Sequence, residues 1–146
     1  MLNEYKIHEQ ERAEQNIPPL PLDPDQTSQL VDLLKADHEE SELLLYLLKE
    51  RVPAGVDQSA YVKAAFLADI TTGKTTSPYL SKLEAVKLLG TMLGGYNIQP
   101  LIACLKTDDL GEEAANALSK TLLIFDAFNE IFDLSKTNSY AKTVVD

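Results

Sequence analysis

Residues 87–102 read KLLGTMLGGYNIQPLI, an apolar run followed by two glycines, an aromatic residue and a second apolar run. The first run continues a helix, and we expect Gly94 and Gly95 to end it, because glycine adopts the left-handed conformation of a helix C-cap without penalty. We expect Asn97 to start the next helix, with Pro100 in its first turn, where the missing N–H costs little. The stretch therefore predicts a tight corner between two packed helices.

The glycines of this corner raise the alternative of a phosphate-binding loop. A dinucleotide-binding fingerprint needs Gly-x-Gly-x-x-Gly between a strand and a helix, and Gly90, Gly94 and Gly95 have neither that spacing nor the strand. The Gly-Lys-Thr at 73–75 also lacks a preceding strand, and Ala68 stands where a Walker loop has its first glycine. We therefore interpret the glycines as joint residues, with Gly90 allowing a neighbouring helix to approach closely.

Capping residues mark further helix starts along the chain. Asp23 precedes a proline, and Asp57 precedes an alanine-rich segment. Ser81 and Glu84 have the spacing of a capping box, in which each side chain bonds the other residue's backbone N–H. A leucine-rich helix beginning near Ser41 has little room for a polar face, so we expect it to be buried on two sides.

Apolar residues recur every three or four positions, and no segment alternates with the period of two that is typical of a strand. The expected helix faces are Val62, Phe66 and Ile70; Leu83, Val86, Leu89 and Leu93; and Ile98, Leu101, Ile102 and Leu105. The acidic stretch 108–113 starts a helical segment without a breaker until Ser135, either one long helix or two helices with a bend near Asp126. We predict an all-α fold of stacked antiparallel helix pairs, a HEAT-like α-solenoid or superhelix.

The chain length is that of a single domain, residues 1–146. We divide it into an N-terminal helix (1–16), a proline-rich strap (17–23), stacked helices (24–134) and the start of a C-terminal helix or linker (135–146). Prolines force the strap to be extended. We expect Leu20 and Leu22 to lie on the core, the alternative being a proline-rich ligand for a recognition domain. The chain stops in mid-pattern without a cap after Val145, which predicts a piece excised from a longer protein.

The composition is that of an acidic globular protein. Lys and Arg number 13 against 23 Asp and Glu, a net charge of −10, which disfavours nucleic acids and anionic membranes because both attract Lys and Arg. No apolar run approaches the roughly 20 residues that span a bilayer, and the N-terminus does not resemble a signal peptide. A single cysteine excludes an internal disulfide and suits a reducing compartment. We therefore expect a cytoplasmic protein with no membrane contact and no direct nucleic-acid contact.

Residues that could support chemistry are few. His8 and His38 are thirty positions apart, and neither has a partner at the spacing of a metal-ligand pair. Cys104 lies next to an apolar helix face, and we interpret it as a packing residue rather than a reactive thiol. We assign no catalytic, cofactor-binding or metal-ligating residue in this chain.

Three groups of irregular matches resemble the N-terminal domain of bacterial aconitate hydratase B, over nearly the whole chain and in the right order. They are RVPAGVD at 51–57 with AYVKA at 60–64; LLGTM at 88–92 with GGYNI at 94–98 and PLI at 100–102; and ALS at 117–119 with TLL at 121–123 and FD at 125–126. Pro-Leu-Asp at 21–23 before a leucine-rich helix also fits. The resemblance implies a HEAT-like domain that precedes the catalytic domains of a much longer enzyme.

That enzyme family interconverts citrate and isocitrate through cis-aconitate on a [4Fe–4S] cluster. The cluster needs three cysteine ligands, and this chain has one, in a stretch unlike a ligand motif. Neither the cluster ligands nor the catalytic serine can be carried over to this chain. The resemblance implies contacts with other domains of the same enzyme, dimerisation or contact with metabolic enzymes, and a part in substrate channelling. The phosphate contacts of any messenger-RNA binding by the family are expected from other domains.

We therefore expect the N-terminal, non-catalytic domain of an aconitate hydratase, an enzyme of the lyase class. The alternative is a free-standing HEAT-like adaptor that shares the domain but has no enzymatic activity.

Overall fold

The computed structural model describes residues 1–120 and 128–145. Within these residues the regular secondary structure is helical, apart from an isolated β-bridge between Ser77 and Leu80. The helices are α1 (Leu2–Glu14), α2 (Pro24–Leu34), α3 (Ser41–Glu50), α4 (Gln58–Thr72), α5 (Lys82–Gly90), α6 (Ile98–Leu105), α7 (Gly111–Ser119), α8 (Phe128–Ser135) and α9 (Ser139–Val145). The predicted all-α fold is confirmed.

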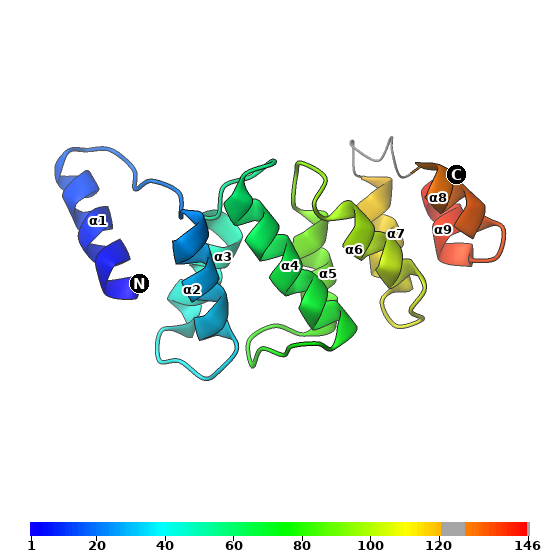
Figure 1. Cartoon of the computed structure of the whole chain (residues 1–146), viewed down its shortest axis with the longest axis horizontal. Coiled ribbons are helices and arrows are strands. Elements are labelled where there is room, and N and C mark those ends of the chain that lie inside the picture. The colour runs from blue at the N-terminus through cyan, green and yellow to red at the C-terminus, as the bar shows by residue number, and fades with distance from the viewer. Residues whose placement is uncertain (121–127, 146) are drawn as a thin grey trace.

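The helices lie in a row of pairs from α1 at one end to α8 and α9 at the other (Figure 1). Consecutive helices pack as the pairs α2–α3, α4–α5, α6–α7 and α8–α9. Neighbouring pairs contact each other through α2 with α4, α5 with α7, and α7 with α9. Each pair thus buries its apolar faces against the next pair, which is the arrangement of an α-solenoid. In the described part of the chain no helix is long and apolar enough to cross a membrane.

The predicted helix caps are present. The carboxylate of Asp23 accepts the N–H of Gln26 at 2.7 Å, and the Gln26 side chain accepts the N–H of Asp23 at 3.0 Å. Asp57 accepts the N–H of Ser59 at 2.8 Å at the start of α4. Ser81 accepts the N–H of Glu84 at 3.1 Å in the second capping box. These bonds satisfy backbone donors that the first turn of a helix otherwise leaves without partners.

The strap is extended, and hydrogen bonds fix it to α1 and, through the N–H of Leu22, to the carbonyl of Arg51 after α3. The backbone N–H of Leu20 donates to Nε2 of His8 at 2.9 Å, and Nε of Arg12 donates to the carbonyl of Pro18 at 2.9 Å. Leu22 is 1 % exposed, as predicted, but Leu20 is 54 % exposed, so the prediction for Leu20 is wrong. A proline-rich chain favours three residues per turn, so residues two apart do not share a face.

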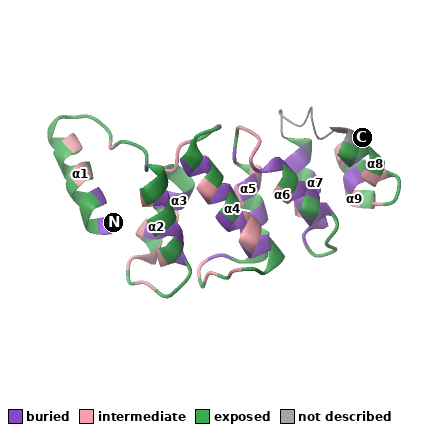
Figure 2. Ribbon diagram, in the orientation of Figure 1, coloured by how far each residue is buried: buried purple, intermediate pink, exposed green. Residues whose placement is uncertain are grey.

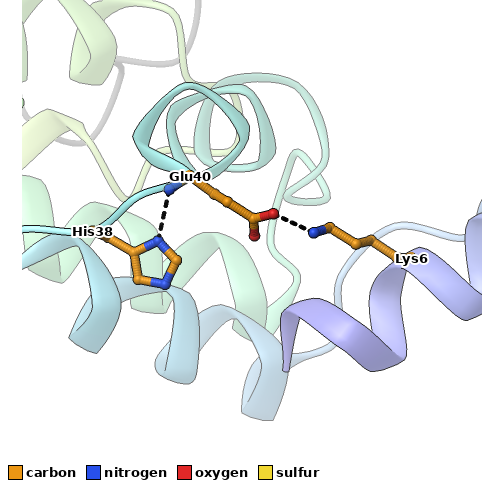
Figure 3. A network of polar contacts seen from close by, with 3 residues as sticks. All are labelled: Lys6, His38 and Glu40. Carbon is orange, nitrogen blue, oxygen red and sulfur yellow. Dashed lines mark hydrogen bonds and ion pairs between the residues drawn. The ribbon is translucent and has the colours of Figure 1, made fainter.

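Helix α1 lies apart from the stack, and Figure 2 shows buried positions at only one end of it. These buried residues are Leu2 and Tyr5. Polar contacts join α1 to the turn before α3, because Lys6 forms an ion pair with Glu40 (Figure 3). The backbone N–H of Glu40 donates to Nδ1 of His38 at 3.0 Å, which places His38 in a polar turn, as expected.

The corner at residues 87–102 differs from its prediction in one respect. Helix α5 ends at Gly90 rather than at the glycine pair, and Gly94 and Gly95 lie in the following loop, both with a φ of +94°. A Cβ built on Gly90 would lie 2.8 Å from the Cβ of Ala117, which confirms the close approach of a neighbouring helix there. The predicted helix end is therefore wrong by three residues, because the last helical residue is Gly90 rather than Leu93.

Asn97 explains why the helix stops early. It begins α6 as predicted, but its side chain does not cap that helix. Its Nδ2 instead donates to the carbonyls of Leu89 at 2.6 Å and Met92 at 3.2 Å, and the residue is 1 % exposed. The amide thus joins the last turn of α5, at Leu89, to the loop that follows it, at Met92.

Two predicted helix faces need correction. In α5, Val86 and Leu89 are buried, whereas Leu83 is 42 % exposed, and Leu93 lies beyond the helix and is 66 % exposed. In the helix beginning at Ser41, three of the five leucines are buried and Leu43 and Leu45 are only half-buried. A helix that contacts a neighbouring pair along one stripe buries that stripe fully and its flanks partly.

The C-terminal part is more than one helix. Helix α7 ends at Ser119, so the alternative of one long helix is wrong, and Asp126 lies outside the described residues. In the last pair, Nδ2 of Asn138 donates to the carbonyl of Leu105 at 2.9 Å, at the end of α6. Its Oδ1 accepts the N–H groups of Tyr140 and Ala141 at the start of α9. One side chain therefore caps two helices.

Candidate functional site

Two loops lie side by side at one edge of the row, residues 51–57 between α3 and α4 and residues 91–97 between α5 and α6 (Figure 1). The loops meet at Gly94, where an added Cβ would overlap the backbone of Gly55. Both glycines have positive φ angles, +94° and +82°, a conformation that L side chains rarely adopt. The approach of the two loops therefore depends on glycine at both positions.

Tyrosine side chains hold these loops together. The hydroxyl of Tyr96 donates to the carbonyl of Val56 at 2.9 Å, and its ring meets Tyr61 edge-on with centroids 5.5 Å apart. Such aromatic pairs contribute about 0.5–1.5 kcal/mol beyond the area they bury. Val56, Tyr61 and Leu93 are 75 %, 51 % and 66 % exposed. The outer surface of the joined loops therefore presents large apolar side chains to solvent.

A cavity of about 350 Å³ lies where these loops meet α3, α4 and α5. Its lining is mostly apolar, with three charged side chains: Lys49, Glu50, Val52, Pro53, Ala54, Lys63, Leu88, Thr91, Met92 and Leu93. Ala54, Thr91 and Leu93 are exposed, so the cavity opens to solvent. An apolar lining with a few convergent polar groups is typical of a small-molecule site.

The buried charge of this cavity is Lys63, which is 6 % exposed. No hydrogen bond or ion pair joins its ammonium group to another residue in the described part of the chain. Burial lowers the pKa of Lys63 below its ordinary value, and the carboxylate of Glu50 opposes this shift only in part. The Lys63 side chain is buried, but its ammonium group reaches the open cavity, where an anion would pair with a cation that has no protein partner among the described residues.

A smaller cavity of about 170 Å³ adjoins the first. Lys49 and Leu88 line both cavities, and the smaller one is completed by Leu80, Glu84 and Lys87. Lys49 therefore lines the same cavity as the buried Lys63, and Lys87 lines the adjoining cavity, on a chain whose net charge is −10.

Lys63 was not among the candidates drawn from the sequence, although a signal for its burial existed. It lies three, four and seven positions before Phe66, Leu67 and Ile70, all of which are buried. The face predicted for this helix began instead at Val62, which is half-buried. A lysine in register with a buried apolar stripe is the signal that would have located the cavity.

The other candidate residues have structural roles where the structure describes them. His8 and His38 each accept a backbone N–H, and Gly73 ends α4 with a φ of +82° rather than following a strand. Cys104 is 4 % exposed, and burial raises the pKa of its thiol, which fits a packing residue. No group of three or more His, Cys, Asp or Glu side chains suited to a metal ion occurs in residues 1–120 and 128–145.

Comparison with known proteins covers the whole chain. A family model described as "Aconitate B N-terminal domain" matches residues 4–146. The chain is 54 % identical over 149 residues to a Synechocystis protein named aconitate hydratase B, covering 100 % of this chain and 17 % of that protein. Proteins of the same name from Escherichia coli and Helicobacter pylori are 52 % and 45 % identical to this chain over 147 residues. Each of these matches covers 99 % of this chain and 17 % of the relative. The chain thus spans about a sixth of the length of these curated relatives.

Proposed function

The chain belongs to the family of aconitate B N-terminal domains, and on that basis we propose that it is the N-terminal helical domain of an aconitate hydratase. The observation that carries this proposal is the 54 % identity over the whole chain to the first part of an aconitate hydratase B. In the proposed parent enzyme, citrate and isocitrate interconvert through cis-aconitate. We propose residues 1–146 as one domain that makes protein contacts and performs no chemistry by itself.

The residues of this chain do not fit the [4Fe–4S] cluster that such an enzyme uses. These clusters are held by cysteine thiolates, and the chain has a single cysteine, Cys104. That thiol is buried and its pKa is raised, which disfavours the thiolate form that binds metal. We therefore derive no catalytic step from this chain and propose that the cluster and the reacting groups belong to the rest of the parent enzyme.

The surface of the joined loops supports a role in protein contact. Exposed large apolar side chains favour protein contact, and Val56 and Leu93 on the two loops and Tyr61 on the adjoining α4 are exposed. The proposed partners are the other domains of the same enzyme, a second copy of it, or a neighbouring metabolic enzyme that exchanges citrate or isocitrate with it.

Charge and cysteine content support the remaining parts of the proposal. A net charge of −10 opposes direct contact with a phosphate backbone. A single, buried cysteine suits a reducing compartment, and we propose that the parent enzyme is cytoplasmic.

The test compares the 146-residue chain with the protein encoded by its complete reading frame. We expect the complete protein to show cluster absorbance and to hydrate cis-aconitate, and the 146-residue chain to do neither. Hydration of cis-aconitate by the 146-residue chain would overturn the assignment of the chemistry to other domains. A reading frame that ends near residue 146 would instead support a free-standing HEAT-like adaptor.

A further inference from the structure

We propose that the cavity around Lys63 binds the carboxylate group of a small organic acid. This site is separate from the citrate and isocitrate chemistry proposed for the parent enzyme, and it depends only on residues of this chain.

The position of Lys63 provides the electrostatic reason for an anion. Of the charged residues that the structure describes, only Lys63 is buried. It lies on α4, and the carboxylate of Glu50 is near enough to influence its titration but forms no ion pair with it. The free chain thus carries an incompletely compensated cation at an open cavity. A bound carboxylate would supply the missing charge and accept hydrogen bonds from the ammonium group.

The lining favours an organic acid over an inorganic anion. Val52, Pro53 and Met92 offer apolar surface to a hydrocarbon segment. The hydroxyl of Thr91 already donates to the carbonyl of Leu88 at 2.7 Å and is therefore not available as a donor to a phosphate. The cavity volume of about 350 Å³ lies within the range of small-molecule sites.

The adjoining cavity extends the site. Lys49 lines both cavities, and Lys87 lines the smaller one together with Glu84. An acid with two carboxylates would place one at Lys63 and the other toward Lys49, which is exposed and solvated. Because an exposed charge pair contributes little, we expect the second carboxylate to add less to the affinity than the first.

The experiment is a nuclear magnetic resonance titration of the 146-residue chain with butyrate, succinate, butyramide and inorganic phosphate. We expect butyrate and succinate to shift the backbone resonances of residues 52–54, 63 and 91–93. Butyramide has the same carbon skeleton as butyrate without its charge, and phosphate has charge without a hydrocarbon segment. Both are expected to bind more weakly than butyrate.

The decisive variant is Lys63→Met, which keeps an unbranched apolar stem in the buried position. We expect it to weaken butyrate binding by at least about tenfold, because a charge-assisted hydrogen bond is lost from a buried site. The matched control is Lys142→Met, at an exposed lysine on α9, with unchanged binding expected.

Equal butyrate affinity in wild type and Lys63→Met, or no shift at residues 52–54, 63 and 91–93 with either acid, would overturn the proposal. Phosphate binding as tight as that of butyrate would overturn the assignment to organic acids. The titration measures binding to the 146-residue chain alone. A complete protein without aconitate hydratase activity would therefore overturn the proposed function but not this binding site.

Discussion

Replacing Asn97 with alanine should destabilise the chain, because the Asn97 amide is the shared cap of the corner between α5 and α6. Its Nδ2 donates to two carbonyls, those of Leu89 at 2.6 Å and Met92 at 3.2 Å, inside a region where Asn97 is 1 % exposed. Each such hydrogen bond contributes about 0.5–1.5 kcal/mol net. Removing both should therefore lower the free energy of unfolding by about 1–3 kcal/mol.

One opposing effect limits this loss. The Oδ1 atom of Asn97 is buried and has no hydrogen-bond partner among the described residues. Alanine removes that atom as well as the donor, and relief from an unsatisfied polar atom offsets part of the destabilisation. Asn97→Asp keeps the oxygen, loses the donor and turns a carboxylate toward two carbonyl groups. We therefore expect Asn97→Asp to be less stable than Asn97→Ala at neutral pH.

The assay is urea unfolding followed by far-ultraviolet circular dichroism, with thermal unfolding as a second measurement. For a chain of this size, 1–3 kcal/mol corresponds to a decrease in Tm of about 2–12 °C. Asn116→Ala on α7 is the matched control, because Asn116 is exposed and alanine is the better helix former. An Asn97→Ala variant as stable as wild type, or an Asn97→Asp variant more stable than Asn97→Ala, would refute the capping role.

Three further substitutions test the close contacts and the buried charge. Gly90→Ala should lower stability by about 1–2 kcal/mol despite alanine's helix propensity, because its Cβ would lie 2.8 Å from that of Ala117; adding Ala117→Gly should restore part of the loss in urea unfolding. Gly94→Ala should cost more than Gly95→Ala, since both positions have a φ of +94° but only a Cβ at 94 meets neighbouring backbone; equal midpoints would contradict this packing. Lys63→Met should raise stability at neutral pH, because burial disfavours the charged lysine of the wild type. This advantage should shrink as the pH rises toward 10.5, the ordinary value of a lysine pKa. Over that window the unfolded wild type binds more protons than the folded wild type, so the wild type gains stability as the pH rises. An advantage that stays constant over this window would show that the pKa of Lys63 is not lowered by burial.

The helix starts could be predicted from the sequence because a cap is a local arrangement. Asp23, Asp57 and Ser81 each bond a backbone N–H two or three residues away, so the sequence around each residue contains the whole interaction. The four buried apolar residues of α6 were likewise predicted from their spacing. These are Ile98, Leu101, Ile102 and Leu105.

The end of α5 could not be predicted, because distant residues determine it. Ala117 packs against Gly90 from another helix, and Asn97 bonds a carbonyl eight residues earlier in the chain. The glycine pair was correctly associated with unusual backbone, but neither glycine ends the helix, and Gly94 meets the loop at Gly55. Local pattern identified the glycines, and only the tertiary contact identifies what they do.

The cavity around Lys63 was also missed from the sequence, for a different reason. Lysine is usually interpreted as a surface residue, and the face predicted for this helix starts at Val62 rather than at Lys63. The register of Phe66, Leu67 and Ile70 with Lys63 was nevertheless present in the sequence. The residues that line the cavity with Lys63 come from α3, α5 and two loops, and no local pattern predicts their convergence.

Asn138 has a consequence for how the stack of helix pairs unfolds. In an array whose units contact only their neighbours, terminal units fray independently of the rest. Asn138 bonds the last carbonyl of α6 and the first N–H groups of α9 at once. Detachment of α9 therefore also removes a cap from α6, which belongs to the neighbouring helix pair. Fraying of the C-terminal pair and loosening of α6 should then appear as one cooperative event in hydrogen exchange, with matched protection in both helices.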